Sequence, residues 1–370
     1  MTETTHKRYE LKPEKDTVRI EYERQLWQAR YSPCGQFLIA CGYDAVIQRW
    51  DIRGTEPQRM KPLTGHNGWV QQMDFCPKQK RLLTADSWGQ LTCWSYADEE
   101  PNKVWSLPQA HEGWIRAVAV SPDGQTVATG GNGSVVRLWS TADGQLQKEL
   151  PHQERVFSLR FHPSGKTLIS GDLTGMIREW DPAESKEIRR LDASLLYADE
   201  AETKGRIQQC GGVRCLEFDA DGKRLVCGGQ KEPGGGFATG TPCVLVFDFE
   251  SGKLIREMPM GGTQDGFTYD ARFHPDGFVM ATSSAFPGKG HVWFWHPDED
   301  EAFFSEKRLP NGRSLSLHSD GHRIAHLTSD SRNGNGRSLK DGEYQGGTAV
   351  IQIMGLLPVQ VASSSAGPAL

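Results

Sequence analysis

Two short patterns recur in step along the chain, and this repeat restricts the possible folds more than any other feature. In the first pattern, an apolar run ends just before a turn, and its last residues are Tyr31, Phe75, Val120, Phe161, Phe218, Phe273 and Leu317. In the second pattern, a later apolar run ends at Trp50, Trp94, Trp139, Trp180, Phe247, Trp295 and Met354. Because the two series alternate without interruption, the sequence predicts seven equivalent structural units.

Each unit contains three stretches in which apolar and polar residues alternate, followed by a weaker fourth. The clearest copy reads "VFSLRF", "TLISG" and "MIREW", and then "KEIRRL" from Lys186 to Leu191. Alternation with a period of two, interrupted by Gly, Pro, Asp and Ser, predicts antiparallel strands joined by tight turns. Since a four-stranded sheet cannot cover both of its faces alone, neighbouring units must pack together. We therefore predict an all-β fold, a seven-bladed β-propeller.

The two ends of the chain are expected to meet in the last unit, which has no fourth strand of its own. The stretch "DTVRIEYE" places Val18, Ile20 and Tyr22 on one face of a strand. We expect this N-terminal strand to close the ring and to leave no exposed sheet edge. The predicted organisation is a flexible segment over residues 1–15, a single propeller over 16–357 and a disordered tail over 358–370.

Composition narrows the class of protein. The 42 basic and 47 acidic residues give a net charge of -5, whereas nucleic-acid-binding proteins usually carry a basic surface. The eight cysteines form no CxxC pair, so we interpret them as reduced, mostly buried side chains rather than disulfides or metal ligands. No segment has the run of about 20 apolar residues that spans a bilayer, and the polar N-terminus is unlike a signal peptide. We expect a cytoplasmic protein.

Several short motifs resemble the repeats of one known family. They are "GH" at Gly65 and His66, "SPDG" from Ser121 to Gly124, and "RLWS" and "REWD" around Trp139 and Trp180. In this order they resemble the WD-repeat β-propeller family over nearly the whole chain. The units that contain Phe218, Phe273 and Leu317 lack both the "GH" element and a clear Trp-Asp pair.

This resemblance implies a buried network inside each blade, made of the "GH" histidine, a Ser or Thr, an Asp and the Trp. These four groups can satisfy one another's hydrogen bonds between strands, where water is excluded. The matching residues are His66, Thr84 and Trp94 in one unit, His152, Ser170 and Trp180 in another, and Asp44 with Trp50 in the first. Asp86 and Asp172 fall two positions before the usual aspartate, so we expect the network to be partial. We interpret these histidines as structural rather than catalytic.

Three other motifs suggest chemistry but occur in the wrong context. "PSGKT" at 163–167 lacks the earlier glycine of a phosphate-binding loop, and no helix follows "EPGGGFATG" at 232–240. His318, His322 and His326 are spaced by four residues and would share a face only in a helix, yet they are flanked by strand patterns. We predict no metal site and no cofactor.

Two features point to one face of the propeller as the functional face. The inner strands begin there, and strand parity places four long insertions there, at 192–212, 230–242, 284–290 and 329–347. Loops carried on a rigid scaffold commonly bind partners. The first residues of the inner strands are largely aromatic residues and arginines, which are enriched where partners bind. The predicted partner-binding residues are Trp27, Trp69, Trp114, Arg116, Arg155, Phe157, Arg214, Phe267, Tyr269 and Arg313.

The sequence thus predicts a non-catalytic protein-interaction scaffold, a monomeric propeller acting within a complex. Its arginines favour an acidic peptide or another anionic group, and net acidity disfavours nucleic acid. Two alternatives stay open: a propeller enzyme such as a hydrolase, and a small-molecule binder that uses the central channel. Catalysis would require converging His, Asp or Glu groups. Some of the aromatic residues could also serve only to pack neighbouring blades.

Overall fold

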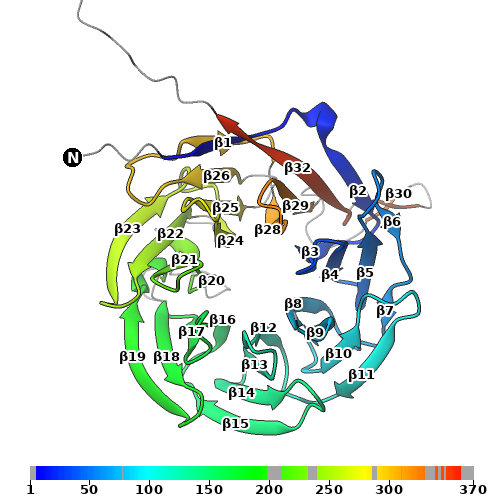
Figure 1. The fold of residues 1–370 in the computed structure, drawn as a ribbon, viewed down its shortest axis with the longest axis vertical. Helices are drawn as coiled ribbons and strands as arrows, with labels where there is room; N and C mark the ends of the chain where they lie inside the picture. Colours follow the sequence, from blue (N-terminus) through cyan, green and yellow to red (C-terminus); the bar gives the residue numbers. More distant parts are fainter. Residues whose placement is uncertain are drawn as a thin grey trace, which may run out of the picture.

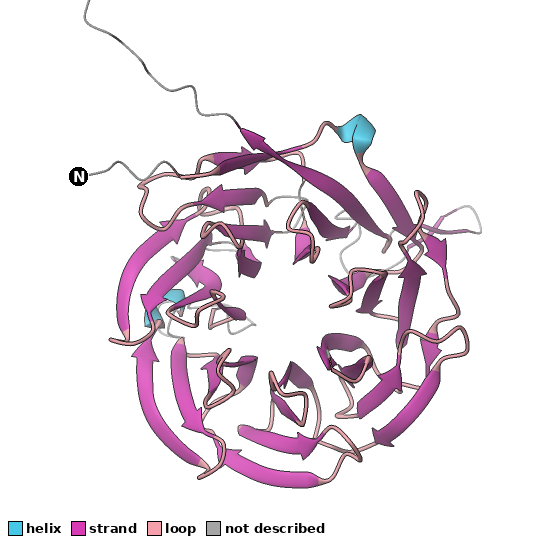
Figure 2. Ribbon diagram, viewed as in Figure 1, coloured by secondary structure: helices cyan, strands magenta, loops and turns pink. Residues whose placement is uncertain are grey.

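Seven sheets are arranged radially around a central channel (Figure 1). The computed structural model describes residues 6–76, 78–197, 211–231, 240–285, 290–309, 311–329, 338–340, 343–345 and 347–359. Within these residues strands dominate, and the helical segments are two short 3-10 turns, η1 (Glu14–Asp16) and η2 (Ser194–Leu196) (Figure 2). The predicted all-β seven-bladed propeller is confirmed. None of the described helical segments is long and apolar enough to cross a membrane.

The first four blades follow the repeat closely, and in each the strands run antiparallel from the channel outward. Blade one contains β3 (Leu26–Tyr31), β4 (Phe37–Gly42), β5 (Val46–Asp51) and β6 (Gln58–Arg59), with β7 (Leu63–Thr64) also paired to β5. Blade two contains β8 (Val70–Cys76), β9 (Arg81–Asp86), β10 (Leu91–Ser95) and β11 (Asn102–Leu107). Blade three contains β12 (Ile115–Val120), β13 (Thr126–Gly131), β14 (Val135–Ser140) and β15 (Leu146–Pro151). Blade four contains β16 (Val156–Phe161), β17 (Leu168–Asp172), β18 (Met176–Asp181) and β19 (Lys186–Asp192).

The last three blades have the same plan with more variation. Blade five contains β20 (Cys215–Phe218), β21 (Arg224–Lys231), β22 (Thr241–Asp248) and β23 (Lys253–Pro259). Blade six contains β24 (Phe267–Phe273), β25 (Val279–Ser284), β26 (Val292–Trp295) and β27 (Phe304–Glu306). Blade seven contains β28 (Gly312–Leu317), β29 (Arg323–Ser329) and β32 (Ala349–Val359), completed by β1 (Arg8–Leu11) and β2 (Val18–Tyr22). A separate short hairpin pairs β30 (Ser338–Lys340) with β31 (Glu343–Gln345).

The hydrophobic core lies between blades rather than inside any one of them. All six residues of β4 are buried, because both faces of the sheet are covered by neighbours. Among the described residues there are seven apolar clusters, and each joins two adjacent blades. For example, Ile177 of blade four packs with Leu245 of blade five. Each blade is therefore stabilised by its neighbours, and the ring must close for every blade to be covered.

The N-terminal strand closes the ring, as predicted. β2 pairs antiparallel with β32, from Val18 opposite Ile353 to Tyr22 opposite Ala349. Ile20 and Tyr22 are buried in the cluster that joins blade seven to blade one. Removing β2 would therefore both expose an edge of β32 and open this apolar junction.

The structure departs from the predicted boundaries at both ends of the chain. Part of the segment expected to be flexible, residues 8–11, forms β1 and pairs with β32 as far as Val359, two residues beyond the predicted boundary. Tyr9 is buried between blades six and seven, and its hydroxyl donates to Asp276 Oδ2 at 2.6 Å. The alternation of Tyr9 and Leu11 is too short to stand out among charged neighbours. Residues 360–370, within the predicted tail, lie outside the described residues.

The cysteines match their predicted state. The seven that the structure describes are free thiols, and all of them are buried except the exposed Cys34 and the partly buried Cys215. Cys210 lies outside the described residues.

Candidate interaction face

A hydrogen-bonded network braces blade two from inside. His66 Nε2 lies 2.7 Å from Thr84 Oγ1, and Trp94 donates its indole N–H to the same hydroxyl at 2.7 Å. The other imidazole nitrogen, Nδ1, lies 3.0 Å from Asp86 Oδ2. A neutral imidazole satisfies all of these contacts if Nδ1–H donates to the carboxylate and Nε2 accepts from the threonine hydroxyl.

Asp86 joins this network although it stands two positions before the expected place. Its two oxygens accept from His66 and from the backbone N–H groups of Asn67, Gly68, Trp88 and Gln90. Burial opposes ionisation of this carboxyl, but the hydrogen bonds outweigh that effect and lower the pKa of Asp86. The network of blade two is therefore complete, where a partial one was expected.

Blades three and four repeat the core of this arrangement. His111 Nε2 lies 2.7 Å from Thr129 Oγ1, which accepts from the Trp139 indole at 2.8 Å. In blade four the members are His152, Ser170 and Trp180, with distances of 3.1 and 2.8 Å. Burial and a nearby arginine lower the pKa of His111 and of His152 to about 4. Asp172 bonds backbone and side-chain groups of its own turn and approaches Arg178 Nη2 at 3.5 Å, so blade four shares only part of the pattern.

Blade one differs from the predicted network. Asp44 accepts a hydrogen bond from the hydroxyl of Tyr22, which in turn accepts from Gln48 Nε2 at 2.8 Å. Trp50 is buried in the apolar cluster between blades seven and one. The structure therefore does not bring Asp44 and Trp50 into one network, because the position that carries Thr84 in blade two is Ala40 in blade one.

From blade four to blade one, other histidines link one blade to the next. His162 Nε2 contacts the carbonyl of Gly222 at 3.1 Å, His274 Nε2 that of Gly321 at 2.9 Å, and His318 Nε2 that of Gly35 at 2.9 Å. His326 is fully buried, and its Nε2 lies 2.9 Å from Thr282 Oγ1 of the preceding blade. The members of the trio His318, His322 and His326 thus have separate positions. Among the described residues, no group of His, Cys, Asp and Glu could hold a metal ion.

At the mouth of the central channel, aromatic rings and arginines form a closed ring of contacts, which we call the mouth ring. Each member contacts the next through a ring–ring or cation–π contact, in the order Trp27, Tyr43, Trp69, Trp114, Arg116, Phe157, Arg214, Phe267, Tyr269, Arg313 and back to Trp27. The closest of these place Arg116 4.2 Å from the Trp114 ring centroid and Arg214 4.2 Å from that of Phe157. Such contacts hold planar donors in fixed orientations.

Two arginines of the mouth ring, Arg116 and Arg313, and the neighbouring Arg155 carry positive charge on this face. None of the ion pairs formed among the described residues involves Arg116, Arg155 or Arg313. Burial and, to a smaller extent, the charges of Arg214 and Arg155 lower the pKa of Arg116 to about 10. Arg116 uses one donor, its Nε–H, on Asn132 Oδ1 at 2.7 Å. An anion bound here would relieve the repulsion among these arginines.

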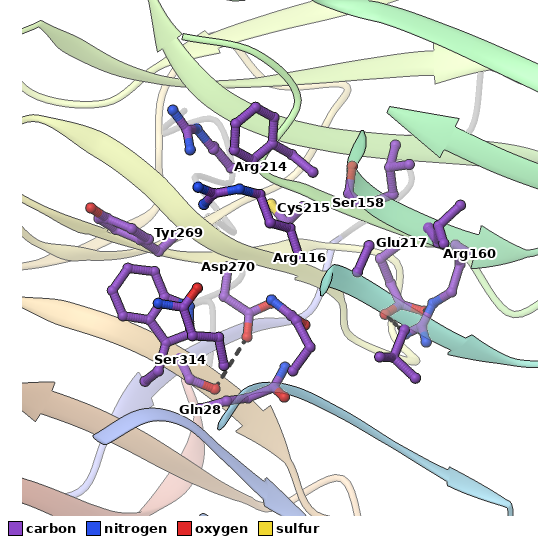
Figure 3. Close-up of a pocket in the computed structure, with 18 of the residues that line it drawn as sticks. Gln28, Arg116, Ser158, Arg160, Arg214, Cys215, Glu217, Tyr269, Asp270 and Ser314 are labelled. Atoms are coloured by element: carbon purple, nitrogen blue, oxygen red, sulfur yellow. Dashed lines mark hydrogen bonds and ion pairs between the residues drawn. The ribbon is translucent and has the colours of Figure 1, made fainter. Parts of the chain in front are cut away.

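Below the mouth, the channel is lined by charges of alternating sign. Arg30 lies 3.7 Å from Asp74, Arg160 pairs with both Asp74 and Glu217, and Arg272 pairs with both Glu217 and Asp270. Figure 3 shows Arg160 facing Glu217, and Asp270 beside Ser314. Burial opposes ionisation of Glu217, yet the charges of Arg160 and Arg272 lower its pKa. This layer is internally neutralised, in contrast to the mouth.

Comparison with known proteins matches the geometry. The repeat family described as WD domain, G-beta repeat, matches residues 19–51, 57–95, 101–140 and 144–181. Each match contains the outer strand of one blade and the three inner strands of the next, and together the matches reach from β2 to β18 of blade four. The chain carries four WD repeats. Blades five to seven have lost the motif residues and, apart from β2, lie outside the matched ranges, but their strands have the same order and complete the propeller.

Curated WD-repeat relatives match short segments of the chain. "Protein SEC13 homolog" of Dictyostelium discoideum is 31% identical over 88 residues, which is 23% of this chain and 28% of that protein. "Nuclear distribution protein PAC1" of Coccidioides posadasii is 34% identical over 68 residues, 18% of this chain and 14% of that protein. "WD repeat and FYVE domain-containing protein 2" of Caenorhabditis briggsae is 43% identical over 51 residues, 14% of this chain and 12% of that protein. The chain therefore spans less than a third of each of these relatives.

All of the predicted partner-binding residues except Arg155 belong to the mouth ring, and the ten residues occupy four locations on this face. Trp69 and Trp114 line a hollow beside the channel, Phe267 is buried behind Arg214, and the exposed Arg155 lies near Arg116. The other six line the mouth of the channel: Trp27, Arg116, Phe157, Arg214, Tyr269 and Arg313. The central parts of the four long insertions lie outside the described residues, so their place on this face stays a prediction.

Sequence reasoning missed two aromatic residues of this face. Tyr43 follows β4 and completes the mouth ring between Trp27 and Trp69. Trp88, in the turn "DSWGQ" between β9 and β10, is 68% exposed and lines the same hollow as Trp69. A large aromatic residue in a polar turn was the available signal, because such a turn cannot bury it.

Proposed function

We propose that this WD-repeat protein is a non-catalytic interaction scaffold that binds an acidic segment of a protein partner at the mouth ring. Proteins of this family generally act as protein-interaction scaffolds. The observation that carries the proposal is the closed ring of aromatic residues and arginines, in which Arg116 and Arg313 form no ion pair with a carboxylate of the described residues.

The chemistry of the mouth ring suits a carboxylate-bearing peptide. Planar guanidinium groups that already stack on aromatic rings lose little conformational freedom when they bind carboxylates in pairs of hydrogen bonds. Aromatic residues and arginine are also the residue types that contribute most of the binding energy at protein interfaces. Binding an anion would reduce the repulsion that lowers the pKa of Arg116.

The channel itself favours binding over catalysis. The acidic residues that line it, Glu217 and Asp270, are each engaged by an arginine, and so is the neighbouring Asp74. A paired carboxylate of lowered pKa, such as Glu217, is a poor general base at neutral pH. The enclosed volume of about 100 Å³ is also small for an organic ligand.

The proposal can be tested with a labelled peptide and two charge-matched variants. The probe is an N-acetylated decapeptide containing four glutamates, and its glutamine analogue is the reference. Arg116→Gln combined with Arg155→Gln should weaken binding of the glutamate peptide by about tenfold or more, because two charge pairs are lost, one of them at the partly buried Arg116.

The control removes the same net charge elsewhere. Arg53 and Arg308 are exposed and pair only with carboxylates of their own turns, so Arg53→Gln combined with Arg308→Gln should change the affinity less than twofold. If both double variants weakened binding of the glutamate peptide equally, the effect would come from the net charge of the protein alone, which would contradict the proposal. Equal affinity of wild type for the two peptides would also contradict it.

A further inference from the structure

An aromatic hollow lies beside the channel mouth, over blades one to three. Its walls are Tyr43, Trp69, Trp88 and Trp114, and it has a volume of about 820 Å³. Trp69 is 43% exposed and Trp88 is 68% exposed. The backbone approaches closely at Gly68, where an added Cβ would lie 2.5 Å from Ser87 Oγ and 2.8 Å from Trp88 Cδ1. Because Gly68 has no side chain, the Trp88 ring can lie against its backbone.

The tryptophans of the hollow differ from those inside the blades in the use of their indole N–H groups. Trp94, Trp139 and Trp180 donate to a buried hydroxyl. In the part of the chain that the structure describes, the indole nitrogens of Trp69, Trp88 and Trp114 make no hydrogen bond. Asn132, also in the lining, accepts from Arg116 through Oδ1, which leaves its amide N–H groups as donors. The hollow thus combines flat apolar walls with hydrogen-bond donors.

The charges around the hollow disfavour a cationic ligand. Asp44 is the carboxylate among the described lining residues, and it already accepts from Tyr22 and from the backbone N–H of Val46. Arg24 lies in the same lining, and Arg116 stacks on Trp114 at the channel side. A fitting ligand therefore has apolar surface, acceptor groups and, toward the channel, negative charge.

We infer that the hollow binds a proline-rich segment in the polyproline II conformation, with an acidic residue toward the channel. Proline rings pack on flat aromatic walls, and their carbonyl groups accept from indole and amide donors. Proline has no N–H that would need an acceptor in the hollow. Charge complementarity sets the direction, because the acidic flank meets Arg116 while the prolines occupy the hollow. This inference rests on the proposed function for that flank and adds a second subsite to it.

The test uses two labelled dodecapeptides with the same acidic flank. In one, the flank is followed by a run of prolines; in the other, alanines replace the prolines, so that apolar groups and carbonyls remain but backbone N–H groups appear. Wild-type protein should bind the proline peptide at least about tenfold more tightly. Trp88→Ala should abolish that preference, and Trp88→Phe, which keeps a ring without an N–H, should give an intermediate affinity.

Ile188→Ala is the matched control, since Ile188 is an exposed apolar residue on the outer strand of blade four. It should leave both affinities within twofold, and urea midpoints should show that all variants remain folded. Equal binding of the two peptides, or an unchanged preference in Trp88→Ala, would overturn the inference. Self-association that Trp88→Ala abolishes, without a proline preference, would assign the hollow to a second copy and overturn it as well.

The two proposals can fail separately. If the acidic decapeptide depends on Arg116 and Arg155 while prolines add nothing, the mouth site stands and the hollow site fails. If the Arg116 and Arg155 double variant binds the proline peptide as tightly as wild type does, the hollow binds proline without the acidic contact. In that case the direction assigned to the segment is overturned.

Discussion

Blades two to four and blades five to seven are stabilised by polar groups in different places. In the first region a histidine, a hydroxyl and a tryptophan bond one another inside each blade, as in His66, Thr84 and Trp94. In the second region histidines reach from one blade to the next, as His274 does to Gly321 and His326 to Thr282. Both arrangements satisfy buried donors and acceptors at positions that water cannot reach.

The difference shows that losing a repeat motif does not mean losing its physical role. Blades five to seven lack the "GH" histidine and the Trp hydrogen bond, yet their strands keep the same antiparallel order. Polar bracing has moved from the blade interior to the junction between blades. The motif residues are one way to satisfy the buried hydrogen-bonding groups of a blade, and the fold tolerates other arrangements.

Lowering the pH should give the largest effect, in both regions. The pKa of His111 and of His152 is about 4 and that of His326 is about 3 in the folded protein, chiefly because of burial, against about 6.5 when unfolded. Between pH 6.5 and 4 the unfolded state therefore binds protons that the folded state does not. The free energy of unfolding should fall as the pH is lowered through this window, by about 2 kcal/mol per imidazole between pH 7 and pH 5.

Urea unfolding at pH 7, 6 and 5 measures this dependence. His111→Gln and His326→Gln each remove one such group, from the first and second region respectively, and each should flatten the curve by a similar amount. If the free energy of unfolding of either variant depended on pH as steeply as that of wild type, the histidine of that region would not contribute to the pH dependence.

Asp86→Ala should give the second largest effect, confined to the first region. It removes the acceptor of the His66 imidazole and of four backbone N–H groups. Because these donors would lose their acceptor at a buried site, we expect the free energy of unfolding to fall by about 4 kcal/mol. The exposed turn residue Asp143, which accepts from the Gln145 backbone, is the control, and Asp143→Ala should cost less than about 1 kcal/mol. Equal losses would mean that the network does not stabilise blade two.

Thr282→Val should give the smallest effect, and it tests the second region. The substitution leaves His326 Nε2 without its hydroxyl partner at a fully buried site, at a cost of about 2 kcal/mol. In a double-mutant cycle with His326→Leu, the two changes should couple by at least about 0.5 kcal/mol. Thr126→Val, at a hydroxyl that makes a long contact to Gln147, should stay within about 0.5 kcal/mol. Additive losses from Thr282→Val and His326→Leu would show that the two side chains act independently.

The strand pattern was sufficient to predict the fold, because a period of two, turn residues and seven copies all indicate the same architecture. It predicted β2 from the alternation of Val18, Ile20 and Tyr22. It did not predict β1, because only Tyr9 and Leu11 alternate there and their burial depends on the distant blade six. Asp86 was expected outside the network, since spacing along the chain does not show how a turn directs a carboxylate back toward His66.

The candidate face was predictable as a set of aligned positions but not as a ring. Aligning the inner strands grouped Arg116, Phe157 and Arg214, and the structure places them in contact. Tyr43 and Trp88 belong to turns between second and third strands, so the same alignment could not include them. The pairing of Asp74, Glu217 and Asp270 with arginines of other blades also depends on closure of the ring, which no local pattern encodes.

The pairing of β32 with the N-terminal strands β1 and β2 has a consequence for how the protein is made. The ribosome produces β2 first and β32 last, with about 330 residues between Tyr22 and Ala349, and at roughly 5–20 residues per second this gap lasts on the order of 16 to 65 s. During that interval Ile20 and Tyr22, buried in the finished ring, have no partner strand. A nascent chain of this protein therefore leaves these two apolar side chains uncovered until β32 has been synthesised, and closure of the ring must follow that step.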